Sequence, residues 1–250
     1  MNIRFDGKIV VVSGAGHGLG RTIAQSFSDL GAVVHGCDIS EKNLAETKGG
    51  RNIHTHVVDL TDRKAAATWI HDIETGGKSI FCLVNNAGGV AGQVWRPLED
   101  IPDEDWDRIF AINIGAAMAL SRAAAPGMKK AGQGRVVNIS SGAGLQASLT
   151  GVQAYCAAKH AVVGLTRQLA HEFGPFGITV NSVAPGFIRS NPSTEKQWES
   201  YGAKGQQELV ERIALKHLGT AQDIANAVIF FASDLAAFVN GQVIQVDGGR

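Results

Sequence analysis

The sequence is short of cysteine, of excess charge and of long hydrophobic runs, and each shortage excludes a class of protein. Its three cysteines, Cys37, Cys82 and Cys156, are odd in number and lie in apolar or helical contexts, so no disulfide framework is expected. The 23 Lys and Arg residues equal the 23 Asp and Glu residues, whereas a nucleic-acid-binding protein would carry a basic excess. We therefore expect no nucleic-acid partner, and a reducing, cytoplasmic location fits best.

Hydrophobic segments are equally scarce. The apolar run near the N-terminus extends only from Ile9 to Val12, which is too short for a signal peptide. No stretch approaches the roughly 18 apolar residues of a membrane span, so we expect no membrane partner. Glycine is abundant instead, with 31 of 250 residues. Because glycine lacks a side chain, this excess indicates tight turns and close approach of the backbone to helices or ligands.

Short β-branched runs alternate with helical patterns along the whole chain. This alternation, with several strands apolar on both faces, predicts a single doubly wound α/β domain of the Rossmann type over residues 1–250. Its sheet is expected to be mostly parallel and seven-stranded, with helices on both faces. The predicted strands are Lys8–Ser13, Ala32–Asp38, Asn52–Asp59, Ser79–Asn85, Arg135–Ser140, Thr179–Val183 and Val243–Val246. The predicted helices are Leu19–Leu30, Arg63–Glu74, Asp103–Lys130, Tyr155–Phe173 and Ala221–Ala232. The segment Gly186–Gly205, rich in Ser, Asn, Pro and Gly, is predicted to be a long loop near the substrate.

A glycine-rich turn follows the first predicted strand. Gly14, Gly18 and Gly20 would let the chain turn off the strand and let a ligand approach the helix N-terminus, where free N–H groups bind pyrophosphate. The spacing G-x3-G-x-G differs from the commoner dinucleotide pattern because position 19 is Leu. A nucleoside triphosphate loop is excluded because Arg21 stands where that loop has Lys. A turn without a ligand remains the simpler alternative.

Two acids end predicted strands on the same side of the sheet. Asp38 lies where a carboxylate would accept hydrogen bonds from the adenosine ribose, which favours NAD over NADP because the charge repels a 2′-phosphate. The alternative for Asp38 is an acidic helix cap before Ser40. Asp59 has two interpretations, a contact to adenine or a cap for the helix after Thr61.

A Tyr-x3-Lys pair marks the candidate chemistry. Tyr155 and Lys159 share one face of a predicted helix, and an adjacent ammonium together with a nicotinium charge would lower the pKa of a phenol from ~10. Ser140 and Ser141 end a strand 14 residues before this tyrosine, and ligands of parallel sheets bind at the carboxyl ends of strands. For Ser141 a plain turn beside Gly142 is the alternative.

Together with four further motifs, these features resemble the short-chain dehydrogenase/reductase (SDR) family over nearly the whole chain. The further motifs are Asn85-Asn86-Ala87-Gly88, Asn113 between two isoleucines, Pro185-Gly186 and Asp247-Gly248-Gly249. The resemblance implies that Tyr155 is the general acid/base, that Ser141 holds the substrate oxygen and that Lys159 binds the nicotinamide ribose. It also implies that Asn113 anchors a water in a proton relay, and that the protein is a homotetramer whose interface includes Phe238 and Val246.

The resemblance implies NAD as cofactor, bound by a set of residues at the carboxyl ends of the strands. The expected set is Gly14, Gly16, His17, Gly18, Leu19, Gly20, Asp38, Asp59, Leu60, Asn85, Ala87, Gly88, Tyr155, Lys159, Pro185, Gly186, Ile188 and Ser190. No metal is expected, because His54 and His56 share a strand face without an apparent third ligand. The spacing from Ser141 to Tyr155 is one residue longer than in many relatives, which leaves Ser140 and Ser141 as alternatives for the catalytic serine.

The sequence therefore predicts an NAD(H)-dependent oxidoreductase that acts on a secondary alcohol or ketone. Substrate contacts are expected from Trp95, Arg96, Arg189 and Trp198 in addition to Ser141, which favours a small polar, sugar-like or anionic compound. An NADPH-dependent 3-oxoacyl-[acyl-carrier-protein] reductase is the first alternative, and Asp38 argues against it. A non-catalytic dinucleotide-sensing protein is the second, and the presence of both Tyr155 and Lys159 argues against it.

Overall fold

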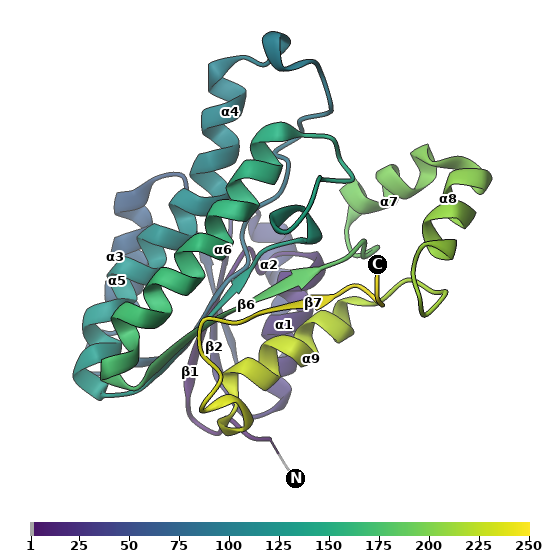
Figure 1. Cartoon of the computed structure of the whole chain (residues 1–250). Coiled ribbons are helices and arrows are strands. Elements are labelled where there is room, and N and C mark those ends of the chain that lie inside the picture. The colour runs from purple at the N-terminus through teal and green to yellow at the C-terminus, as the bar shows by residue number, and fades with distance from the viewer. Residues whose placement is uncertain (1–2) are drawn as a thin grey trace.

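The strands form one parallel sheet with the order β3-β2-β1-β4-β5-β6-β7, seen in a computed structural model that describes residues 3–250 (Figure 1). The strands are β1 (Ile9–Ser13), β2 (Val33–Asp38), β3 (Ile53–Val57), β4 (Ile80–Asn85), β5 (Gly134–Ile139), β6 (Ile178–Pro185) and β7 (Val243–Val246). Every neighbouring pair is parallel, so the expected mostly parallel sheet is parallel throughout. β4, β5 and β6 are buried along their whole length, as strands covered on both faces must be.

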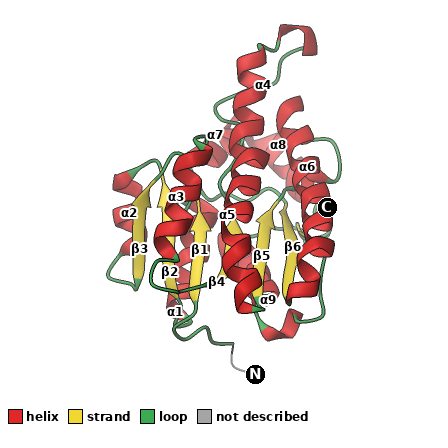
Figure 2. Ribbon diagram, turned by 90° about the vertical axis from the view of Figure 1, so that its left-hand side faces the viewer, coloured by secondary structure: helices red, strands yellow, loops and turns green. Residues whose placement is uncertain are grey.

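Helices cover both faces of the sheet. They are α1 (Gly18–Asp29), α2 (Glu41–Lys48), α3 (Arg63–Ile73), α4 (Asp103–Phe110), α5 (Ala116–Ala131), α6 (Gln153–Phe173), α7 (Pro192–Ser200), α8 (Gly202–Glu211) and α9 (Ala221–Ala232). Figure 2 shows α3, α5 and α6 on the near face, with α1 and α9 behind the sheet. One apolar core, with Phe27 and Phe231, lies under α1 and α9, and the other, with Ile70 and Leu120, lies under α3, α5 and α6.

Strand order reverses between β1 and β4, since the chain passes from β1 to β2 and β3 on one side and from β4 to β7 on the other. At such a reversal the connections leave the carboxyl ends of the strands in opposite directions and open a crevice between them. The predicted glycine turn, Asp38, Ser141 and Pro185 all follow strands at this edge.

The prediction that Gly186–Gly205 forms a loop is wrong, because α7 and the start of α8 lie within it. Its Asn and Pro residues are helix-starting signals here: Asn191 caps α7, Pro192 follows at the first helical position, and Thr194 completes a capping box. The short helix α2, capped by the Ser40 side chain, was also not predicted, since only Leu44 and Thr47 of it are buried.

The predicted helix Asp103–Lys130 is interrupted by a π-helical turn, Ala111–Gly115, which joins α4 to α5. Within residues 3–250 the combined stretch Asp103–Ala131 is the one helix long and apolar enough to cross a membrane, with a mean hydropathy of 1.3. This differs from the expectation that no stretch approaches that length. Its α5 portion packs against α3 and the sheet, and a buried core helix meets the same criterion.

Candidate active site

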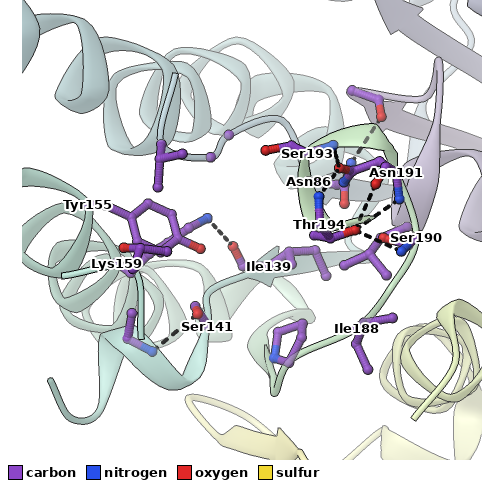
Figure 3. Close-up of a pocket in the computed structure, with 18 of the residues that line it drawn as sticks. Asn86, Ile139, Ser141, Tyr155, Lys159, Ile188, Ser190, Asn191, Ser193 and Thr194 are labelled. Carbon is purple, nitrogen blue, oxygen red and sulfur yellow. Dashed lines mark hydrogen bonds between the residues drawn. The ribbon is translucent and has the colours of Figure 1, made fainter. Parts of the chain in front are cut away.

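A cavity of ≈ 530 Å³ lies at the carboxyl ends of the strands, where the order reverses. Its walls come from the β1–α1 turn and from the segments that follow β2, β4, β5 and β6. Figure 3 shows Ser141, Tyr155 and Lys159 on one side of this cavity and the turn Ser190–Thr194 on the other, close to Asn86. The topology thus brings together residues that are far apart in sequence, such as Gly14 and Thr194.

The glycine turn is held against the end of β4. The amide of Asn86 donates to the Ser13 and Gly14 carbonyls, at 2.9 and 3.1 Å, and Ser13 Oγ accepts the Asn86 and Ala87 N–H groups. Gly14 has φ +64°, and a Cβ there would lie 2.9 Å from the Ala87 Cα, so only glycine fits. The loop is therefore fixed by backbone contacts that a side chain would break.

The N-terminus of α1 faces the cavity without a side-chain cap. His17 occupies the N-cap position and makes no capping hydrogen bond, and the first turn contains no acid. The first N–H groups of a helix lack intrahelical partners and carry a partial positive charge, so they suit an anion. Together with Gly14 and Gly20 in the wall, this arrangement fits the pyrophosphate of a dinucleotide.

Asp38 lies in the cavity wall with both oxygens hydrogen-bonded to backbone. Oδ2 accepts the Gly16 N–H and Oδ1 accepts the Ser40 N–H, each at 3.0 Å. A carboxylate offers about four acceptor positions, so two remain for a ligand. Asp38 can thus act as a cap before Ser40 and still accept hydrogen bonds from the adenosine ribose. A Cβ on Gly16 would lie 2.6 Å from the Asp38 Cγ, which explains the glycine there.

Two expected cofactor residues lie outside the cavity wall for reasons that their contacts explain. Asp59 folds back onto Thr61, whose N–H and Oγ1 it accepts at 2.9 and 2.7 Å, and these bonds hold the pKa of Asp59 below its usual range. Asn85 is buried and donates to Ser121 and Asn138. Gly16 and Gly18 also lie outside the wall and act through neighbours, since Gly18 leaves room for Ser190.

Ser141 rather than Ser140 faces Tyr155. Both serines follow the end of β5, and Ser140 Oγ is buried and donates to the Lys159 carbonyl at 3.1 Å. Ser141 Oγ accepts the Ala143 N–H at 3.1 Å and lies in the cavity wall beside Tyr155. Burial raises the pKa of the Tyr155 phenol, and hydrogen bonding to Ser141 partly opposes that increase. The expected lowering of this pKa therefore does not arise from the chain's own residues.

Lys159 lies one helical turn after Tyr155, with Nζ 5.7 Å from the centre of the phenol ring. Nζ donates to the Ile139 carbonyl at 2.9 Å, a bond visible in Figure 3. The side chain is 4 % exposed, and burial lowers the pKa of Lys159 to about 8. The ammonium is consequently held at a fixed place in the wall next to Tyr155.

Asn113 lies in the π turn, behind the cavity wall. Its Nδ2 donates to the Gly89 and Ile109 carbonyls, at 2.9 and 2.8 Å, and its Oδ1 accepts the Gly89 N–H at 3.0 Å. A Cβ on Gly88 would lie 2.5 Å from Asn113 Oδ1 and 3.3 Å from Lys159 Nζ. Asn113 thus positions Gly88 and Gly89 beside the lysine, with both Nδ2 donor positions used by the protein and one acceptor position left on Oδ1.

The four expected substrate side chains other than Ser141 do not line the cavity. Arg189 pairs with Glu195 at 2.7 Å and lies over Trp198, which stacks on Phe187. Trp95 is 63 % exposed and packs beside Gly151. Arg96 pairs with Asp105 in a separate small depression. These four side chains thus make local contacts at the surface. An outward-facing position describes them better than the expected contact with substrate.

A model of the family described as "Enoyl-(Acyl carrier protein) reductase" matches residues 14–250. The 3-oxoacyl-[acyl-carrier-protein] reductase of Thermotoga maritima is 34% identical over 99% of both chains. The meso-2,3-butanediol dehydrogenase of Serratia marcescens is 37% identical over 99% of this chain and 96% of its own. The chain belongs to the short-chain dehydrogenase/reductase family.

Solved SDR structures share the whole fold. A 3-oxoacyl-[acyl-carrier protein] reductase from Brucella melitensis with bound NAD has a TM-score of 0.87 and 31% identity, covering 99% of this chain and 93% of its own. A gluconate 5-dehydrogenase from Burkholderia cenocepacia in complex with NADP and tartrate has a TM-score of 0.87 and 28% identity, covering 99% and 96%. This SDR is thus an oxidoreductase whose neighbours bind a nicotinamide dinucleotide of either kind.

Most of the expected dinucleotide residues of this SDR line the cavity. They are Gly14, His17, Leu19, Gly20, Asp38, Leu60, Ala87, Gly88, Tyr155, Lys159, Pro185, Gly186, Ile188 and Ser190. Wall residues that sequence reasoning missed include Asn86, Val90, Ser148, Leu149, Thr150, Phe187, Thr194, Gln197 and Arg250. Of these, Asn86 stands in the Asn85-Asn86-Ala87-Gly88 motif, and Phe187, Thr194 and Gln197 lie in the segment expected near the substrate, so these four had a signal in the sequence.

A third histidine, which the sequence alone did not place with them, packs against His54 and His56 of this SDR. His35 on β2 stacks on both rings, and its Nδ1 lies 3.2 Å from His56 Nε2. In the part of the chain that the structure describes, no group of three or more His, Cys, Asp or Glu side chains has a geometry that could hold a metal ion.

Proposed function

We propose that this SDR is an NAD(H)-dependent enzyme that interconverts a secondary alcohol and a ketone. The observation that carries the proposal is the convergence of Ser141, Tyr155 and Lys159 on one wall of the cavity. The uncapped N-terminus of α1 and the side-chain-free turn around Gly14 support a dinucleotide in the rest of the cavity. A bound nicotinamide would supply or accept the hydride, which is chemistry that no side chain provides.

The chain's own residues move the proton. In reduction, the protonated Tyr155 donates to the developing alkoxide, and Ser141 Oγ donates a second hydrogen bond to the same oxygen. Because burial raises the pKa of Tyr155, the phenol holds its proton at neutral pH until substrate arrives. The Lys159 ammonium beside the ring stabilises the phenolate that remains. In oxidation, the same phenolate takes the proton from the alcohol.

Asp38 supports NAD as the coenzyme. Its carboxylate has acceptor positions free for the ribose hydroxyls, and its charge would repel a 2′-phosphate. The similarity to 3-oxoacyl-[acyl-carrier-protein] reductases keeps an NADPH-dependent enzyme of that type as the second candidate. We further propose a small-molecule substrate, a homotetrameric assembly and a cytoplasmic location.

Replacing Tyr155 tests the reaction. Tyr155→Phe keeps the ring but removes the proton, so kcat should fall by a factor of about 10² or more while NAD binding stays nearly intact. Oxidation by the wild type should accelerate with rising pH as the phenolate forms. Steady-state rates and coenzyme titrations measure both. Near-normal turnover by the Phe variant would exclude Tyr155 as the proton carrier.

A further inference from the structure

Arg250 lies in the wall of the catalytic cavity, although no motif marks it. It follows β7, whose Val246 pairs with Pro185 and accepts the Gly186 N–H at 3.0 Å. Gly248 and Gly249 adopt φ of +71° and +83°, and Gly248 accepts the Leu215 N–H at 3.1 Å. The backbone is therefore anchored up to the residue that enters the cavity.

The strand order places Arg250 at the end of the cavity opposite Asp38. Asp38 ends β2, Ser141 follows β5, and Arg250 lies beyond β7 at the far edge. With strands roughly 4.8 Å apart, the five steps from β2 to β7 span about 24 Å. Arg250 thus belongs to the end where substrate reacts, while Asp38 belongs to the adenosine end.

The guanidinium of Arg250 has no partner in the protein. Within residues 3–250 it makes no ion pair and donates no hydrogen bond, and its Nε is buried without an acceptor. Arg189, by contrast, is paired with Glu195 outside the cavity. A buried donor without a partner costs free energy, which a ligand carrying acceptor oxygens would recover.

Among the described residues, no other charged side chain of the cavity wall competes with an anion for the Arg250 guanidinium. Lys159 is the remaining ammonium and is held by the Ile139 carbonyl. Among the side chains that line the described cavity, the one carboxylate belongs to Asp38, at the opposite end. An arginine matches a carboxylate with two parallel hydrogen bonds, so it orients such a group as well as attracting it.

We propose that Arg250 binds the carboxylate of the substrate, so that this SDR acts on hydroxy acids and keto acids. The proposal rests on the proposed function, and it replaces Arg189 as the anion-binding residue. The carbonyl to be reduced meets Ser141 and Tyr155, and the carboxylate extends towards β7. Arg250 acts through binding and has no part in proton transfer.

Three keto acids and their methyl esters test the proposal, because the acids differ in the distance between the ketone and the carboxylate. Pyruvate, acetoacetate and levulinate place the ketone at increasing distance from the carboxylate, and each ester keeps the ketone but removes the charge. Reduction is followed with the preferred reduced coenzyme for the wild type, Arg250→Met, Arg250→Lys and the matched control Arg189→Met. Binding of each acid to the coenzyme-loaded enzyme is measured by calorimetry.

We expect one acid to be reduced with a much lower KM than its ester. Arg250→Met should raise that KM by about 30-fold, the loss of charged hydrogen bonds worth about 2 kcal/mol, and leave the ester unchanged. Arg250→Lys should be intermediate, and Arg189→Met should behave as the wild type. Equal KM values for acid and ester, equal effects of Arg250→Met on both, or no binding of any acid would overturn the proposal.

The two proposals fail in different ways. If the ester is reduced in a Tyr155-dependent reaction and the acid is not preferred, the proposed oxidoreductase activity is supported and the proposed role of Arg250 is wrong. If no ketone is reduced, the proposed reaction fails for these probes. Calorimetry then decides on Arg250 alone, since acid binding that Arg250→Met abolishes supports the anion site and absent binding removes it.

Discussion

At the scale of single residues, neighbouring serines have unlike environments. Ser140 is 2 % exposed and its hydroxyl donates to the Lys159 carbonyl, whereas Ser141 faces the Tyr155 phenol in the cavity. The sequence could not separate them, because spacing along a chain does not give the direction of a side chain after the strand has ended. The hydrogen-bond partners of the two hydroxyls in the structure resolve the choice.

Removal of each serine hydroxyl should therefore have different effects on kcat. Ser141→Ala should lower kcat by about 10²-fold, since one hydrogen bond to the developing alkoxide is lost, while the loss of its bond from the Ala143 N–H should cost no more than about 1 kcal/mol of unfolding free energy. Ser140→Ala should cost about 1 kcal/mol of unfolding free energy with much smaller kinetic effects. Urea unfolding and steady-state rates measure the pair. If Ser140→Ala were the variant with the large loss in kcat, the assignment of Ser141 would be wrong.

Coenzyme choice also depends on one residue and its neighbour. Asp38→Asn removes the charge and keeps one acceptor oxygen, so only one of the Gly16 and Ser40 N–H groups retains its partner. Ile39, which is 73 % exposed in the wall, offers a place for a cation. The variant Asp38→Asn with Ile39→Arg should shift the ratio of kcat/KM for NADH over NADPH towards NADPH by 10-fold or more, about 1.4 kcal/mol.

Ile39→Met serves as the matched control for that change, because it replaces the same side chain without adding charge. Kinetics with both coenzymes give the ratios. A wild-type enzyme that uses NADPH as efficiently as NADH would remove the argument from Asp38.

At the scale of elements, predictions from the sequence succeeded where burial decides and failed where capping or tertiary contacts decide. All seven strands were predicted within a few residues, since each is a compact β-branched run. α7 was taken for loop because its starting residues, Asn191 and Pro192, resemble turn residues in composition. The side chains expected to touch substrate are locally paired outside the cavity, and Arg250 stands in no helix or strand pattern.

The histidine stack between β2 and β3 makes this pair of strands sensitive to acid. Burial and the neighbouring His54, His56 and Lys78 lower the pKa of His35 to about 4. The pKa of His56 is lowered too, against the opposing charge of Asp72. The unfolded chain binds these protons near pH 6.5. Below that pH, proton binding to the unfolded chain therefore lowers the free energy of unfolding.

The free energy of unfolding should consequently fall as pH decreases from about 6.5 towards 4, a loss that His35→Phe should reduce. Urea unfolding at a series of pH values between these limits gives the slope. His71→Phe, a histidine outside the stack, is the comparison variant. An identical slope in the wild type and in His35→Phe would assign the acid sensitivity to other groups.

At the scale of the whole molecule, the sheet has an edge at β7 with apolar side chains beside it. Phe238 is fully exposed in the connection before β7, and Leu235 and Ile244 are 46 % and 37 % exposed. An unpaired edge strand with exposed apolar neighbours is a template for association with another chain. The homotetramer implied by the SDR resemblance would cover this surface.

A charged residue at Phe238 should weaken that assembly. We expect light scattering of the wild type to give four times the 26.3 kDa chain mass, and Phe238→Asp to shift the population towards smaller species. Val94→Asp, which charges a similarly exposed site on another connection, is the control. A wild type that remains a monomer at micromolar concentration would contradict the prediction.

The reversal of strand order between β1 and β4 also allows coenzyme preference and substrate specificity to evolve separately. Asp38 follows β2, whereas Ser141 and Arg250 follow β5 and β7, although Asn86 after β4 and Ser190 after β6 also lie against the glycine turn. Changes at one end leave the other about five strand spacings away, beyond the range at which substitutions interact. Substitutions near Asp38 can therefore change the coenzyme preference without changing the substrate specificity. Natural selection can act on these two properties one at a time, the first linked to the redox balance of the cell and the second to its carbon supply.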